Sequence, residues 1–231
     1  MKSRRTGAII VAFLLSCATV LVLSACASSL DSESGTSSST AEKSAKSSKK
    51  GEGSKLAASI GEYADSILSR GQTSDFQTEI LKRTVQEGSM PAGDYENSWS
   101  MFKRCMSDKG FPELSYNKTD NGIYDIFVNS EKTPNLTGGL YDNAYSFCIL
   151  DYFSDVADVY EKQVGNPKLY SVPEEAAVDC LHHMNLVPKN YTLEDFNNEV
   201  KGSKGSSFDI KNNAVQECLV PNGIYLLDAR K

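Results

Sequence analysis

Cysteine is the residue type with the clearest chemistry in this chain of 231 residues, because thiols form disulfides, bind metals or act as nucleophiles. Beyond Cys17 and Cys26 near the N-terminus, four cysteines are spread over the rest of the chain: Cys105, Cys148, Cys180 and Cys218. An even number of cysteines predicts disulfides in an exported chain. Zinc binding is the competing interpretation, but no C-x-x-C spacing is present, so no metal site is expected.

A faint internal repeat favours one of the three pairings that four cysteines allow. Residues 98–112 and 175–188 each carry a cysteine in a helical pattern that leads to a proline. Each is followed by a second helical pattern with a cysteine, at 143–149 and 213–219. The simplest account is two units, each a pair of helices linked by its own disulfide. We therefore predict the pairs Cys105–Cys148 and Cys180–Cys218.

Residues for other catalytic chemistry are scarce. The only histidines, His182 and His183, are neighbours on a predicted helix and point about 100° apart, so they cannot bind one metal ion together. No G-x-S-x-G elbow, Walker loop or G-x-G-x-x-G motif occurs. The sequence thus predicts no catalytic residue, metal or cofactor. A carboxylate pair assembled from distant segments remains an alternative.

Aromatic residues are the best candidates for ligand binding. They cluster around a predicted hairpin and the helices on either side of it, and four are candidate binding residues: Trp99, Tyr116, Tyr124 and Tyr145. Aromatic rings bind sugars, peptides and proteins at little entropic cost. Packing in the core is the competing interpretation, and it is the commoner role for aromatic residues at helical spacing.

The periodicity of apolar residues predicts the elements that position these side chains. A hairpin is expected around Asn121-Gly122, because Asn-Gly readily forms a tight primed turn, and a closing strand is expected at 224–227. Helices are expected at about 56–70, 74–88, 91–110, 141–164, 171–185, 192–200 and 209–220. The fold class is mainly α with a small β-hairpin (α+β), with its helices linked by two disulfides.

The first 25 residues have the order of a secretory signal: the basic residues Lys2, Arg4 and Arg5, then an apolar run over 7–23. The run is short for a membrane-spanning helix, which is the competing interpretation. The tetrapeptide Leu23-Ser24-Ala25-Cys26, which starts at the end of this run, resembles the lipobox of bacterial lipoproteins. That resemblance implies cleavage before Cys26 and its lipidation, and two acyl chains give stable membrane anchoring.

Composition divides the rest of the chain in two. Residues 26–55 are rich in serine and nearly lack apolar residues, so we expect a disordered tether. Residues 56–231 are expected to form the ectodomain, with units of about 56–167 and 168–231. Loss of the signal shifts the formal net charge from -6 to about -9, and this acidity argues against nucleic acid as a partner.

A second resemblance lies in the pattern W-x5-C-M-x3-G, formed by Trp99, Cys105-Met106 and Gly110 after Asp94-Tyr95-Glu96. It is similar to a segment of uncharacterised exported lipoproteins of high-GC Gram-positive bacteria. The resemblance implies anchoring at the outer face of the cytoplasmic membrane and transfers no catalytic residue. We expect a binding or accessory module for an envelope protein or wall polymer. The alternatives are a carboxylate-based cell-wall hydrolase and a small-solute receptor of a transporter.

Overall fold

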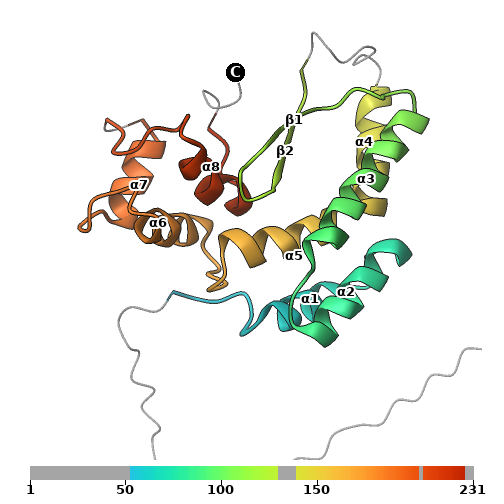
Figure 1. The fold of residues 1–231 in the computed structure, drawn as a ribbon, viewed down its shortest axis with the longest axis horizontal. Coiled ribbons are helices and arrows are strands. Elements are labelled where there is room, and N and C mark those ends of the chain that lie inside the picture. The colour runs from blue at the N-terminus through green and yellow to red at the C-terminus, as the bar shows by residue number, and fades with distance from the viewer. Residues whose placement is uncertain (1–52, 130–138, 203–204, 227–231) are drawn as a thin grey trace, which may run out of the picture. The chain divides into compact units, whose positions relative to one another are not determined.

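The computed structural model describes residues 53–129, 139–202 and 205–226, which are mainly helical with one antiparallel hairpin (Figure 1). This confirms the predicted fold class. The hairpin consists of β1 (Ser115–Lys118) and β2 (Tyr124–Phe127). The helices are α1 (Ile60–Leu68), α2 (Asp75–Glu87), α3 (Ala92–Asp108), α4 (Leu140–Tyr152), α5 (Ser154–Gly165), α6 (Pro173–His183), α7 (Leu193–Val200), α8 (Asn213–Leu219) and the 3-10 turn η2 (Val220–Asn222). None of the described helices combines the length and apolarity needed to cross a bilayer.

Two separate clusters of buried side chains hold these elements together. The first lies among α1 to α5 and the hairpin, and its largest fully buried side chains are Trp99, Tyr95 and Phe102. The second lies among α6, α7 and α8 around Leu181, Phe196 and Leu219. Burial of apolar side chains is the main stabilising contribution in each cluster.

Both predicted disulfides are confirmed. Cys105 of α3 is bonded to Cys148 of α4, and Cys180 of α6 is bonded to Cys218 of α8. The Cα atoms are 5.7 and 5.4 Å apart, within the ordinary range for a disulfide. Each disulfide therefore links one pair of helices, as the internal repeat suggested. Disulfides of this kind are typical of an oxidising, extracytoplasmic compartment.

The long helix predicted after the hairpin is interrupted at Phe153, so that prediction was wrong in this respect. Phe153 has φ of -139°, which separates α4 from α5. The fully buried Gln77 of α2 binds backbone groups on both sides of the break. Its Nε2 donates to the carbonyl of Leu150 at 2.7 Å, and its Oε1 accepts from the N–H groups of Asp155 and Val156 at 2.8 and 3.1 Å. These bonds replace those that a continuous helix would have made.

Residues just before the predicted boundary at residue 56 already take part in the fold. Lys55 forms a β-bridge with Tyr170, and backbone hydrogen bonds join Leu56 to Leu169 and Ser171 to Ser54 at 2.8 and 2.7 Å. The end of the predicted tether is thus paired with the connection between α5 and α6. The signal, Cys26 and the rest of the predicted tether lie outside the described residues.

The closing strand predicted at 224–227 does not form over its described part. Residues 224–226 have no strand pairing. The backbone N–H of Ile224 instead donates to the carbonyl of Leu219, the last residue of α8, at 3.1 Å. This segment contributes Ile224 and Leu226 to the edge of the second cluster.

Candidate functional site

The four candidate aromatic residues have different environments. Trp99 is fully buried, Tyr124 is 9% exposed and Tyr145 is half-buried, whereas Tyr116 is 41% exposed. The Tyr145 ring packs edge-on against Phe102 at 5.6 Å, and burial raises the pKa of its hydroxyl to about 12. Trp99 and Tyr124 therefore serve the core, and Tyr116 is the one of the four with substantial exposed surface.

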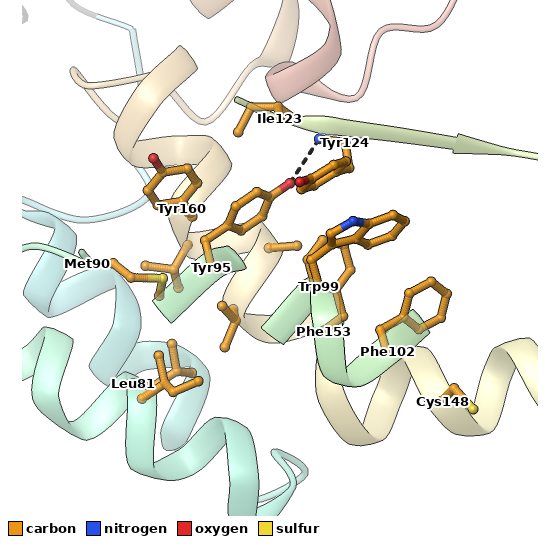
Figure 2. Close-up of a cluster of buried hydrophobic side chains, with 14 of the residues drawn as sticks. Leu81, Met90, Tyr95, Trp99, Phe102, Ile123, Tyr124, Cys148, Phe153 and Tyr160 are labelled. Atoms are coloured by element: carbon orange, nitrogen blue, oxygen red, sulfur yellow. Dashed lines mark hydrogen bonds between the residues drawn. The ribbon is translucent and has the colours of Figure 1, made fainter. Parts of the chain in front are cut away.

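The buried rings fix the position of the hairpin (Figure 2). The Tyr124 ring stacks on Trp99 at 4.3 Å, and the backbone N–H of Tyr124 donates to the hydroxyl of Tyr95 at 3.0 Å. Tyr95 in turn stacks on Tyr160 of α5 at 4.5 Å. Stacked aromatic pairs of this kind add about 0.5–1.5 kcal/mol each beyond the burial of their area. The hairpin is thus held in place by side chains of α3 and α5.

A polar contact with α3 also holds the hairpin in place. Glu96 accepts from the Nζ of Lys118 at 2.8 Å and from the hydroxyl of Tyr124 at 2.7 Å. Burial by itself would raise the pKa of Glu96, but these two donors outweigh it and lower the pKa. The same hydrogen bond to Glu96 raises the pKa of Lys118, which also lies 4.7 Å from the centre of the Tyr124 ring. Lys118 at the end of β1 is therefore held in place by its ion pair with Glu96.

The turn of the hairpin is longer than the two-residue primed turn that Asn121-Gly122 suggested. Thr119 and Ile123 are joined by a backbone hydrogen bond of 2.9 Å, which leaves three residues in the loop. Gly122 occupies the last of these with φ of 92°, a conformation that a side chain disfavours. The Oδ1 of Asn121 accepts from the hydroxyl of Thr119 at 2.5 Å, and its Nδ2 donates to the carbonyl of Glu217 at 3.2 Å.

This contact brings the hairpin next to α8 and creates a groove between them, which we call the hairpin groove. Its volume is about 490 Å³. One side is lined by the hairpin residues Tyr116, Asn117, Lys118, Thr119 and Asp125, and the other by Ile210, Lys211, Asn213, Gln216 and Val220. The two sides come from segments about 95 residues apart in the sequence, which only the fold brings together.

The lining of the hairpin groove offers hydrogen-bonding groups of several kinds. Lys211 is exposed and has no ion-pair partner among the residues that the structure describes. Asn117 and Asn213 are exposed amides, whereas the amide of Gln216 donates to the carbonyl of Ile210. Tyr116 adds an accessible aromatic ring. Aromatic and amide groups together suit a ligand that has both apolar ring faces and hydroxyl groups.

A second exposed surface lies on α4. Leu140, Phe147 and Leu150 are 62, 54 and 64% exposed, and their spacing places them on one side of the helix. The ammonium group of Lys109 lies 4.4 Å from the centre of the Phe147 ring. The pattern of apolar residues did not indicate this surface, because α4 has apolar residues on its buried side as well.

The two histidines have different environments. The Nε2 atom of His182 is 2.8 Å from the carbonyl oxygen of Tyr191, while His183 is exposed. Within residues 53–129, 139–202 and 205–226, no three His, Cys, Asp or Glu side chains are grouped so as to hold a metal ion.

Comparison with known proteins assigns the chain to no family, since no family model, no curated protein and no solved structure matches it.

Proposed function

We propose that this chain is a lipid-anchored, extracytoplasmic binding module that holds a polysaccharide of the cell envelope in the hairpin groove. The lining of the groove is the observation that carries the proposal. It combines one exposed aromatic ring, Tyr116, with amide and ammonium groups on both sides and the hydroxyl of Thr119 on the hairpin side. By resemblance of Leu23-Ser24-Ala25-Cys26 to a lipobox, the anchor is a lipid on Cys26 and the location is the outer face of the cytoplasmic membrane.

A saccharide fits this lining better than the other envelope ligands. A sugar ring has one apolar face that can stack on Tyr116, and its hydroxyls can bind the amides of Asn117 and Asn213. Lys211, whose charge is not already compensated by Glu96 as that of Lys118 is, can neutralise isolated carboxylates on such a chain. A polymer with a high density of negative charge is less suitable, because the mature protein itself has a formal net charge of about -9.

The groove can be tested by cosedimentation of the full chain, in detergent, with insoluble wall polymer. Tyr116→Ala should weaken binding roughly two- to tenfold, since one aromatic contact contributes about 0.5–1.5 kcal/mol. Phe147→Ala is the matched control, because it removes an exposed ring that does not line the groove and should leave binding unchanged. Thermal unfolding of both variants would show whether the fold is intact.

The opposite pattern would contradict the proposal. If Phe147→Ala abolished capture of an envelope protein while Tyr116→Ala had no effect on polymer binding, α4 would be the binding surface and a protein the partner. The anchor is tested separately with Cys26→Ala, which should leave the membrane fraction. Recovery of this variant with membranes at the wild-type level would exclude lipid anchoring through Cys26.

A carboxylate-based hydrolase is the second candidate, and the environment of Glu161 favours it. Glu161 lies on α5, and burial raises its pKa from the ordinary 4.5 to about 8, which favours its protonated form at neutral pH. Lys162 opposes this effect, while Asp158 and Asp125 add to it, and Asp125 lines the hairpin groove. A protonated carboxyl near a second carboxylate is the arrangement of a general acid and base in glycoside hydrolysis.

Binding remains the primary proposal because Glu161 is not among the groove-lining residues. In hydrolysis, Glu161 would give its proton to the leaving oxygen as the glycosidic bond breaks, and Asp125 would take a proton from the attacking water. Release of soluble saccharide from wall polymer by the wild-type chain, lost in Glu161→Gln, would favour the hydrolase. Binding without release would favour the binding module.

A further inference from the structure

A second pocket lies where α5, α6, α8 and the tip of the hairpin meet, and we call it the α6 pocket. Its volume is about 200 Å³. Most of its surface is apolar, and its apolar and aromatic lining residues are Val164, Pro167, Tyr170, Ala176, Cys180 and Met184. It shares no lining residue with the hairpin groove, so its role is independent of the proposed function.

Some charged groups of the α6 pocket form an ion pair, and one does not. Lys168 and Asp179 form an ion pair of 2.6 Å and neutralise each other. His183 is exposed at the rim. The remaining ionisable group, Glu217 of α8, is half-buried, and its carboxylate has no hydrogen-bond or ion-pair partner among the described residues. The pocket therefore holds one uncompensated carboxylate.

The surroundings of Glu217 disfavour its negative charge. Burial raises the pKa of Glu217, and the nearby carboxylate of Asp120 raises it further. Asp120 is itself engaged only weakly, since it accepts from the Nδ2 of Asn213 at 3.5 Å. A carboxylate in an apolar setting is unfavourable unless a cation compensates it. A positive charge beside Glu217 would therefore compensate the carboxylate that the pocket leaves unpaired.

We propose that the α6 pocket binds a small organic ammonium compound, with its apolar body against Ala176 and Met184 and its cationic head group at Glu217. The volume is sufficient for a ligand of this size, because a cavity of about 150 Å³ already holds a benzene molecule. A metal ion fits less well, since it would need several oxygen ligands and the pocket offers one free carboxylate. An anionic ligand would be repelled by Glu217 and Asp120.

The test uses three probes of matched shape on the full chain: benzylammonium, benzyl alcohol and benzoate. We expect saturable binding of benzylammonium in the millimolar range, followed by calorimetry or by NMR line shifts. It should bind roughly tenfold to hundredfold more tightly than benzyl alcohol, as expected for a charge-assisted hydrogen bond, and benzoate should bind most weakly. Added salt should weaken the binding of benzylammonium but not that of benzyl alcohol.

Glu217→Gln keeps the shape of the side chain and removes its charge, so it should abolish the preference for benzylammonium over benzyl alcohol. Glu87→Gln, at the exposed end of α2, is the matched control and should retain the preference. Retained binding of benzyl alcohol by Glu217→Gln would show that the pocket is still formed. The proposal is overturned if no probe binds, if the three probes bind equally, or if the cation preference survives in Glu217→Gln.

Discussion

The contact between Gly165 and Pro221 gives the sharpest test of how the two clusters are joined. Gly165 is the last residue of α5 and is buried against η2. A Cβ atom at Gly165 would lie 2.3 Å from the Cβ and 2.8 Å from the Cγ of Pro221. The side-chain amide of Asn222 also donates to the carbonyl of Gly165 at 3.0 Å. Gly165→Ala must therefore separate α5 from η2.

The cost of this substitution follows from the geometry. Carbon atoms pack at about 3.5–4.0 Å, so the new methyl group overlaps the rigid proline ring by more than 1 Å. Overpacking of this kind costs about 1–3 kcal/mol, and stretching the buried bond from Asn222 adds about 1–3 kcal/mol. The better helix propensity of alanine offsets up to about 1 kcal/mol. The middle of these ranges gives a net destabilisation of about 3–4 kcal/mol, which lowers Tm by about 6–16 °C for a domain of this size.

Gly93→Ala provides the matched control, because Gly93 lies in α3 with open space around it. The same chemical change there should raise the free energy of unfolding by up to about 1 kcal/mol. Chemical denaturation and thermal unfolding of the full chain would measure both variants. A Gly165→Ala protein that is as stable as Gly93→Ala would refute the close packing of α5 on η2.

Three further predictions concern individual interactions. Replacing Cys180 and Cys218 together by alanine should destabilise the protein by about 4 kcal/mol in the chain-entropy estimate for a separation of 38 residues, measured by denaturation without reductant. Tyr124→Phe should cost about 1.5–3 kcal/mol, since it removes a hydrogen bond to the charged Glu96; an unchanged denaturation midpoint would rule that bond out. Because the pKa of Glu161 is raised from 4.5 to about 8, the folded state holds more protons than the unfolded state between these values. Stability should fall as the pH rises from about 4.5 to 8, and Glu161→Gln should flatten this profile.

Local patterns predicted the helices and the disulfides well, because the information lies within short segments. Apolar residues at helical spacing follow the buried sides of α1, α2 and α3. Ser74, where the predicted helix at 74–88 begins, caps α2, since its hydroxyl accepts from the N–H of Gln77 at 3.3 Å. The internal repeat gave the correct disulfide pairing because each disulfide closes a pair of helices within one unit.

The break at Phe153 could not be predicted, because its causes lie on other elements. Residues 141–164 have a helical pattern throughout. The side chains that bind the backbone at the break are Gln77 and Ser74 of the α2 region and Ser98 of α3. Only tertiary contacts bring these polar groups together, and sequence patterns along one segment do not report them.

The candidate site shows the same limit. The aromatic residues were identified from the sequence, but the sequence does not show which of their rings are buried in the core and which remain exposed. Trp99 and Tyr124 stack on each other and are buried, which leaves Tyr116 at the edge. The hairpin groove and the α6 pocket both depend on the contact between the tip of the hairpin and α8. Nothing in either segment alone indicates that contact.

Hydrogen exchange of the full chain with and without purified wall polymer tests the central claim most directly. The account predicts slower exchange on both sides of the hairpin groove, over residues 116–119 and 211–216, and no change over α4. Slower exchange confined to α4, or no change anywhere at saturating polymer, would contradict it.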